Sequence, residues 1–93
     1  MAWRVELDAA ARKDLRAIRD VRLRGRIVRA LQGLEIDPRP SGAKPLVGHA
    51  GVWRVRVGDW RIAYAVRDEV LLVLVVAVGT RGEIYEILQR REG

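Results

Sequence analysis

Three stretches in the second half of the chain have the hydrophobic patterns of β-strands. Residues Val52–Val57 (VWRVRV) and Trp60–Val66 (WRIAYAV) alternate between apolar and polar or small residues with a period of two, which is typical of strands with one face on the core. Residues Val70–Val78 (VLLVLVVAV) are apolar throughout, which indicates a central strand covered on both faces. The short connections Gly58-Asp59 and Asp68-Glu69 predict tight turns, so the three strands should follow one another as antiparallel hairpins.

The alternation also places three arginines on a common face of the predicted sheet. Arg54 and Arg56 point away from the apolar side of the first strand. With a two-residue turn, Arg61 lies directly across from one of them or one step diagonal. Three guanidinium groups on one face repel each other unless an anion lies among them, so this face is a candidate binding site.

The first half of the chain predicts a short strand followed by two helices. Residues Trp3–Leu7 alternate and predict a strand that joins the sheet, and Asp8 is placed to cap a helix over residues 9–20 (AAARKDLRAIRD). Apolar residues recur at helical spacing over Val21–Ile36, and Asp37-Pro38 ends this second helix. The two helices should be antiparallel and should pack on one face of the sheet, with their arginines in solvent.

Two further segments complete the predicted fold. Residues Pro38–Gly51 form the one long loop, and residues Glu83–Arg91 predict a short C-terminal helix that ends with Arg90 and Arg91 in solvent. The whole predicts a small α+β domain over residues 1–93, in the order β-α-α-β-β-β plus the short helix. Its two-helix hairpin packs on a mostly antiparallel, four-stranded sheet.

Composition narrows the classes of function. The chain has no cysteine, so it has neither disulfides nor thiolate metal sites. Its longest apolar run is too short for a membrane span and its N-terminus does not have the pattern of a signal peptide, which predicts a cytoplasmic protein. The net charge is +6, with 18 basic residues against 12 acidic ones. Such an excess favours a polyanion or an acidic protein as partner.

The remaining candidate chemistry is cationic. Carboxylates are scattered, no serine–histidine arrangement suggests a triad, and no glycine-rich loop joins a strand to a helix, so we expect no metal and no cofactor. Arginines hold phosphate oxygens and stabilise the charge of a pentavalent transition state, and RNA supplies its own nucleophile in the 2′-hydroxyl. The candidate residues are Arg54, Arg56, Arg61, Arg81 and Tyr85, together with Lys44 and His49 from the long loop. Taken singly, each is more often an ordinary solvated or half-buried side chain.

The segments KPLVGHAGVWRVRVGDWRIAYAV and VLLVLVVAVGTRGEIYEIL, in this order of elements, resemble the RelE toxins of bacterial type II toxin–antitoxin systems. The similarity covers nearly the whole chain and is strongest from Lys44 to Tyr85. It implies a RelE-like fold and an endoribonuclease that cleaves mRNA in the ribosomal A site without metal, inhibiting translation. It also implies an acidic cognate antitoxin that silences the toxin and through which the complex binds operator DNA.

The resemblance also implies roles for individual residues. The two cationic residues on the strand before the turn correspond to Arg54 and Arg56. The arginine that stabilises the phosphate corresponds to Arg61, and the arginine at the leaving group to Arg81. The tyrosine that orients the 2′-hydroxyl or stacks on a base corresponds to Tyr85. Lys44 and His49 are then candidate RNA contacts.

The chain departs from the RelE pattern where Arg54 and Arg56 replace lysines. An arginine effectively never loses its proton, whereas a lysine in a crowded cationic site does. Stabilisation of the transition state therefore survives the change better than general-base catalysis. The general base is then Tyr85 or His49, or the reaction proceeds without a side chain as base.

Two other functions stay open at this point. ParE toxins have the same fold, inhibit DNA gyrase and have no RNase site. The presence of Arg61, Arg81 and Tyr85 together favours the RelE alternative. The third possibility is a catalytically weak member that acts through antitoxin binding and operator regulation.

Overall fold

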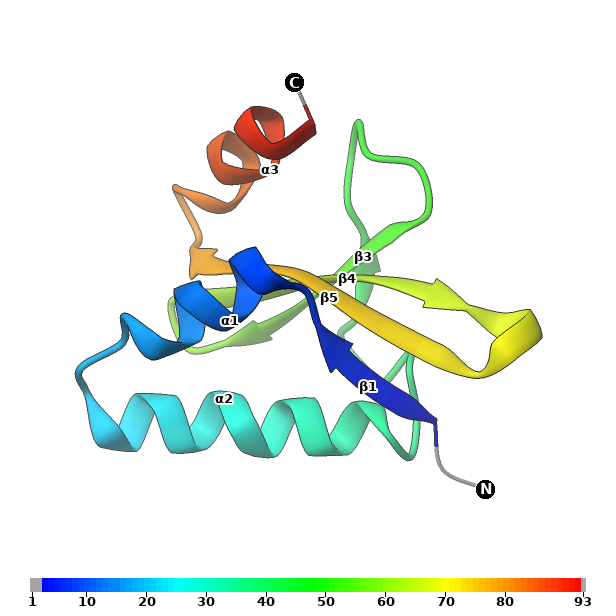
Figure 1. The fold of residues 1–93 in the computed structure, drawn as a ribbon, viewed down its shortest axis with the longest axis horizontal. Coiled ribbons are helices and arrows are strands. Elements are labelled where there is room, and N and C mark those ends of the chain that lie inside the picture. Colours follow the sequence, from blue (N-terminus) through cyan, green and yellow to red (C-terminus); the bar gives the residue numbers. More distant parts are fainter. Residues whose placement is uncertain (1–2, 93) are drawn as a thin grey trace.

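A five-stranded sheet organises the computed structural model, which describes residues 3–92 (Figure 1). The strands lie in the order β1-β5-β4-β3-β2; β1 and β5 are parallel and every other neighbouring pair is antiparallel. The predicted α+β class and element order are therefore confirmed. Along the chain the elements are β1 (Arg4–Leu7), α1 (Ala9–Arg16), α2 (Val21–Leu34), β2 (Lys44–Pro45), β3 (Val52–Val57), β4 (Trp60–Arg67), the 3₁₀ turn η1 (Asp68–Val70), β5 (Leu72–Thr80) and α3 (Ile84–Glu92).

The prediction of four strands was wrong, because part of the long loop joins the sheet. Residues Lys44 and Pro45 form β2, opposite Arg54 and Trp53 of β3. Two residues are too few to show a period, so alternation does not detect such a strand. Since β2 pairs only with this part of β3, the rest of that edge toward Val57 has no strand neighbour within residues 3–92.

The β3–β4 hairpin forms as predicted. Gly58 has a φ of 60°, the positive value that the first position of a primed turn requires. Arg56 lies directly opposite Arg61, and Arg54 lies opposite Ala63, one step along.

The β4–β5 connection is longer than the predicted two-residue turn. It contains η1 and then Leu71 in the left-handed region, with a φ of 52°. The apolar run therefore begins outside the strand, and the Val70 side chain is 61% exposed. Arg39 holds η1 in place, because its guanidinium donates to both carboxylate oxygens of Asp68 (3.2 and 3.0 Å).

Helices α1 and α2 cover one face of the sheet, as expected. The Asp8 carboxylate accepts from the Ala11 N–H (2.8 Å) and begins α1. Asp20 accepts from the N–H groups of Arg22 and Leu23 (3.0 and 3.2 Å) and begins α2. Because Asp20 serves as this cap, α1 ends at Arg16 rather than at Asp20. The core on this face contains Ile27, Leu31, Leu34, Ile62, Tyr64, Val73, Val75 and Val78.

Helix α3 lies on the opposite face of the sheet, with Ile84 and Leu88 buried against Ala63 and Ala77 (Figure 1). A β-bulge makes this possible. Ala63 pairs with Ala77 and Tyr64 pairs with Val75, so Val76 has no partner across β4. The extra residue shifts the alternation of β5, and Ala77 faces α3 while Val78 faces the core on the other side.

An ion pair between Asp14 of α1 and Arg91 of α3 joins the two layers. Arg91 is exposed, as predicted, but the sequence does not indicate this partner. The two side chains form two hydrogen bonds of 2.9 and 2.8 Å. Asp14 also accepts from the Val78 N–H (3.0 Å), and Arg91 donates to the Val76 carbonyl (2.9 Å). β1 ends at Leu7, opposite Val75 of β5. Beyond this point the ion pair takes the place of a strand and satisfies the hydrogen-bonding groups of the β5 backbone.

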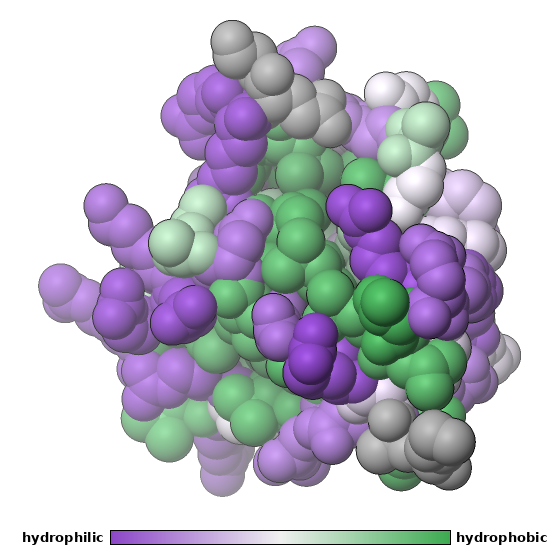
Figure 2. Space-filling view, turned by 45° about the vertical axis from the view of Figure 1, so that its right-hand side comes forward, coloured by the Kyte–Doolittle hydropathy of each residue, from purple (hydrophilic) through white to green (hydrophobic). Residues whose placement is uncertain are grey.

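Helix α3 leaves part of its sheet face uncovered. The side chains of Leu72 and Leu74 on this face are half-buried, and Val70 and Leu71 beside them are exposed. Figure 2 shows apolar side chains gathered in the middle of one face of the molecule, with hydrophilic side chains around them. Among the described helices, none has the length and apolar character needed to cross a membrane.

Candidate functional site

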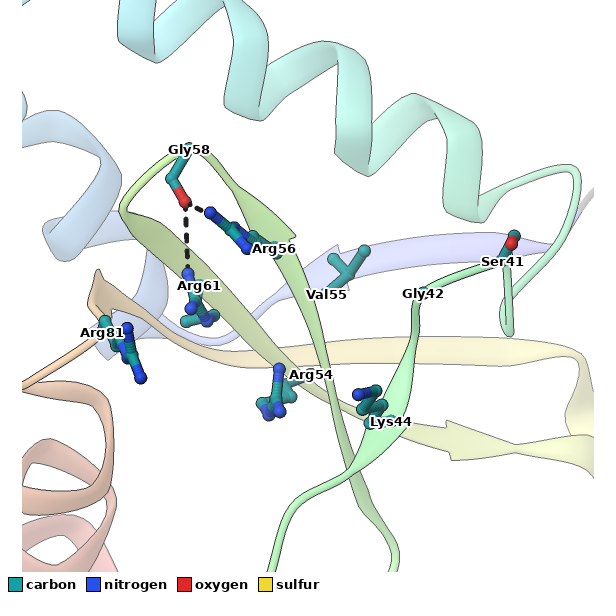
Figure 3. Close-up of a pocket in the computed structure, with 9 residues that line it drawn as sticks. All are labelled: Ser41, Gly42, Lys44, Arg54, Val55, Arg56, Gly58, Arg61 and Arg81. Atoms are coloured by element: carbon teal, nitrogen blue, oxygen red, sulfur yellow. Dashed lines mark hydrogen bonds between the residues drawn. The ribbon is translucent and has the colours of Figure 1, made fainter.

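The predicted arginines line two adjoining hollows on the α3 side of the sheet. The larger has a volume of about 700 Å³ and the smaller, which reaches α3, about 270 Å³. Arg54, Arg61 and Arg81 line both, and Figure 3 shows them on the same side of the sheet. We call these two hollows together the cationic hollow; its other lining residues are Ser41, Gly42, Lys44, Val55, Arg56, Gly58, Ile84 and Tyr85.

The hairpin and the end of β5 hold the arginines in register. Arg61 and Arg56 face each other across β3 and β4. The Arg81 N–H donates to the Asp59 carbonyl (2.9 Å), which ties the end of β5 to the β3–β4 turn. The carboxylate of Glu83 accepts from the Thr80 hydroxyl and closes the turn from which α3 begins, so Tyr85 follows within the first turn of the helix.

Arg61 lies at the centre of the cationic hollow and is only 8% exposed. Its Nη1 donates to the Gly58 carbonyl (3.3 Å), and Arg56 Nε donates to the same carbonyl (3.1 Å) (Figure 3). The Arg61 Nη1 also donates to the Trp60 carbonyl (3.1 Å). Burial, and then the positive charges of Arg56, Arg54 and Arg81, lower the pKa of Arg61. A guanidinium starts from so high a pKa that it stays charged. The protein therefore holds a fixed charge at this point before any ligand arrives.

The cationic hollow has no internal counter-ion among the side chains that the structure describes. No carboxylate lines it. Ion pairs form elsewhere in the described chain, at Arg4–Glu6, Arg39–Asp68 and Arg91–Asp14. Four guanidinium groups without a neutralising partner attract an anion with several oxygens, such as a phosphodiester.

The other three predicted residues lie around the same hollow. Lys44 faces it from β2, opposite Arg54. Tyr85 is 41% exposed at the side formed by α3. His49, on the long loop, lies next to Tyr85, with the two ring centroids 6.4 Å apart and the rings tilted by 48°. Six of the seven predicted residues therefore line the cationic hollow, and His49 lies beside one of them without lining it. The structure adds Ser41 and Gly42, for which the sequence carries no signal beyond their place in the loop.

The chemistry of this arrangement is binding and charge stabilisation. Arginine side chains bind non-bridging oxygens, and a phenol and an imidazole at one side accept or donate a proton. Among the described residues there is no group of three histidine, cysteine or acidic side chains that converges as metal ligands do.

A family model described as the ParE toxin of type II toxin–antitoxin systems (parDE) matches residues 5–85. The chain belongs to this toxin family. A comparison with curated proteins finds no match. The prediction of a RelE/ParE-type toxin of a type II toxin–antitoxin system is confirmed.

Several toxin structures have the same fold. The RelBE2 toxin–antitoxin complex from Mycobacterium tuberculosis contains a chain 28% identical to this toxin, with a TM-score of 0.76 over 87% of this chain and 100% of that one. A double mutant of the E. coli RelE toxin in the free state is 25% identical, with a TM-score of 0.77 over 98% of both chains. A YoeB/ParE toxin from Agrobacterium tumefaciens is 20% identical, with a TM-score of 0.72 over 84% of this chain and 98% of its own, and shows the fold alone. The matching family model and the similar structures carry both ParE and RelE names. Membership of the family is therefore compatible with mRNA cleavage and with gyrase inhibition.

Proposed function

We propose that this toxin is a metal-independent endoribonuclease that cleaves mRNA on the ribosome and so inhibits translation. The supporting observation is the convergence of Arg54, Arg61, Arg81 and Tyr85 on one hollow without a carboxylate among its lining residues. The similarity to RelE structures at 25% identity or more agrees with this activity. A protein that acts only by contact with another protein has no evident need for this set of groups.

The reaction follows from the charge distribution. The 2′-hydroxyl oxygen attacks the adjacent phosphorus, the bond to the 5′-oxygen breaks, and the products are a 2′,3′-cyclic phosphate and a 5′-hydroxyl. Arg61 binds the non-bridging oxygens, whose negative charge grows in the transition state, and Arg81 faces the leaving oxygen. Arg54 and Arg56 orient the strand. The proton of the 2′-hydroxyl passes to Tyr85, to His49 or directly to water, and the leaving oxygen takes one from solvent.

The arginines at positions 54 and 56 affect the rate. Neither gives up a proton near neutral pH, so neither is a general base. General-base catalysis typically contributes a factor of about 10² to 10⁴. We therefore expect cleavage to be slower than with a titratable lysine at these positions.

The test is to map mRNA breaks on purified ribosomes with the wild-type toxin, Arg61→Ala and Arg81→Ala. Loss of one preorganised donor to the transition state lowers the rate by about 10² to 10³, and each variant should also lose toxicity while remaining folded. The exposed Arg67, outside the cationic hollow, provides the matched control Arg67→Ala, which should cleave at the wild-type rate. Full toxicity of both site variants would show that the site is wrongly assigned.

The alternative is a gyrase inhibitor without RNase activity, which the ParE description of the matching family model favours. Intact mRNA on the ribosome, together with accumulated cleaved complexes of gyrase and DNA, would establish it. The same mapping experiment therefore separates the two functions.

We further propose an acidic antitoxin as the partner in the cytoplasm, with operator DNA bound through the antitoxin. Structures of similar toxins are toxin–antitoxin complexes. The net charge of +6 suits an acidic partner. The apolar area around Leu72 and Leu74 offers a surface that such a partner would cover.

A further inference from the structure

A third hollow lies where the β3–β4 hairpin approaches the beginning of α2. Its volume is about 590 Å³, and we call it the flanking hollow. Its lining residues are Asp20, Arg22, Leu23, Arg26, Arg56, Gly58, Asp59 and Trp60. Arg56 and Gly58 also line the cationic hollow, so the two hollows meet at the β3–β4 turn.

Arg26 connects α2 to that turn. Its guanidinium lies so close to Gly58 that a Cβ at this glycine would be 3.5 Å from Arg26 Nη1. The carbonyl of the same glycine accepts from Arg56 and Arg61. The positive charge therefore continues from the sheet around the turn to the helix. Arg22, one helical turn before Arg26, extends it along the same face of α2.

The other lining groups suit a nucleotide better than an acidic peptide. Part of the Trp60 indole borders the hollow, and bases stack on such surfaces with little dependence on sequence. Asp59 and the Asp20 oxygen that does not cap α2 accept hydrogen bonds from the amino groups of bases, which the carboxylates of an acidic peptide cannot donate. Arg22 and Arg26 form no ion pair with any described residue, so their charges are available to a phosphate.

We propose that the flanking hollow binds a second nucleotide of the RNA strand, with its phosphate on Arg22 and Arg26 and its base against Trp60. The strand would pass from the cleaved linkage over Arg56 and around the β3–β4 turn. The open edge of β3 beside Val57 leaves this path free of a neighbouring strand. This inference rests on the proposed RNA-cleaving function and assigns a substrate subsite that the cationic hollow does not contain.

The experiment measures the binding of single-stranded RNA to the whole toxin by competition fluorescence anisotropy. The RNA is 2′-O-methylated, which removes the nucleophile and prevents cleavage. A dinucleotide fills only the cationic hollow, whereas an oligonucleotide of about six nucleotides reaches both hollows. The variants are Arg26→Ala and the matched control Arg29→Ala, an exposed arginine of the same helix outside the flanking hollow.

Arg26→Ala should weaken binding of the longer RNA about fivefold and reduce the slope of log K against log salt by about 0.7, the value for one phosphate contact in a single strand. Binding of the dinucleotide should not change, and Arg29→Ala should change neither. Equal effects of Arg26→Ala and Arg29→Ala would overturn the proposal, since only general charge would then matter. Polyglutamate serves as a model of an acidic protein. If Arg26→Ala weakens the binding of polyglutamate but not that of RNA, the proposal is overturned in favour of an acidic protein partner.

Two further measurements keep this result separate from the proposed function. Arg61→Ala should weaken both RNA lengths; normal binding of both by this variant would count against the cleavage site and not against the flanking hollow. Replacement of Trp3 and Trp53 by phenylalanine leaves Trp60 as the single tryptophan. The longer RNA should then quench its fluorescence and the dinucleotide should not. Quenching by both lengths, or by neither, would place the base elsewhere.

Discussion

At the scale of single residues, Arg61 is the one charged side chain that the structure shows as buried among the residues it describes. Its charge is maintained against burial and against three neighbouring arginines because a guanidinium does not deprotonate. The choice of arginine is therefore a physical requirement at this position. A lysine carries the same charge only at lower pH.

The first prediction concerns Arg61→Lys. The burial and the neighbouring cations that lower the pKa of Arg61 act equally on a lysine, whose ordinary pKa is about 10.4. The ammonium is charged below its lowered pKa and loses its charge as the pH rises through it. In single-turnover assays on ribosomes, cleavage by the variant should therefore fall in the alkaline range while wild-type cleavage persists. Arg67→Lys, outside the site, is the control, and identical pH profiles for all three proteins would contradict the argument.

The second prediction concerns Tyr64, whose ring is fully buried and whose hydroxyl has no hydrogen-bond partner among the described residues. Burial raises its pKa to about 12. The folded protein therefore keeps the Tyr64 proton at a pH where the unfolded chain has lost it. The free energy of unfolding is at its full value below the ordinary pKa of about 10 and falls as the pH rises through about 12. Tyr64→Phe removes the unpaired hydroxyl and should raise the free energy of unfolding at neutral pH by about 1 kcal/mol.

Urea unfolding at neutral and at alkaline pH measures both effects of this substitution. The variant should lose less stability than the wild type as the pH rises through this range. A variant that is instead less stable at neutral pH would mean that the hydroxyl has a hydrogen-bond partner in solution.

The face of the sheet on which a side chain lies could be predicted from the sequence where apolar and polar residues alternate. Alternation placed Arg54, Arg56 and Arg61 on one face, and the structure agrees. The flanking hollow was not predictable, because Arg22 and Arg26 have the spacing of any solvated helix face. Only the packing of α2 against the β3–β4 turn distinguishes them from the other helical arginines.

At the scale of the elements, β5 is longer than β1, and this difference explains the pair of Asp14 and Arg91. The pair satisfies the Val76 carbonyl and the Val78 N–H, which no strand reaches. It also fixes the end of α3, the helix that carries Tyr85. Hydrogen bonding to Asp14 raises the pKa of Arg91, as expected of a close, partly buried pair.

The third prediction is that Asp14→Ala lowers the free energy of unfolding by about 2 kcal/mol, because it leaves Arg91 without its partner and the Val78 N–H without an acceptor. Chemical denaturation measures the change. The matched control is Glu6→Ala, which removes the more exposed pair with Arg4 and should cost at most about 0.5 kcal/mol. Equal losses in the two variants would mean that the Asp14 pair has no special structural role.

The elements themselves were predictable to the extent that local signals defined them. Gly58-Asp59 determined the β3–β4 turn, and Asp8 marked the start of α1. The sequence pattern places Asp20 at the end of the first helix, whereas the structure shows it as the cap of α2. β2 and η1 were not predictable, because each depends on a contact with a residue distant in sequence. β2 pairs with Arg54 and Trp53, and η1 is held by Arg39.

At the scale of the whole molecule, the α3 side of the sheet carries two different surfaces. One end is the cationic hollow, and the other is the apolar area around Leu72 and Leu74. An antitoxin that covers the apolar area would bind without contacting the cleavage site. An antitoxin that covers the basic helices would instead approach from the opposite face.

The fourth prediction distinguishes these two modes of antitoxin binding. Leu74→Asp places a charge in the apolar area and should weaken binding of the cognate antitoxin at least tenfold while leaving mRNA cleavage intact. Val28→Asp, at an apolar position of α2 that is 37% exposed, is the matched control and should have little effect. Both variants are first checked for a normal unfolding transition. Weakening by Val28→Asp alone would place the antitoxin on the helices.

The unpaired Val76 constrains how the length of this toxin can vary. Deleting Val76 would remove the bulge and leave Val75 opposite Tyr64 and Ala77 opposite Ala63, so Arg81 and the helix behind it would keep their places. Inserting a residue that forms no further bulge would turn everything after it to the other face of the sheet, and Arg81 would leave the site. Related sequences that keep the site should therefore differ in length in the 38–51 segment or around residues 68–71, and in β5 by the loss of this one residue.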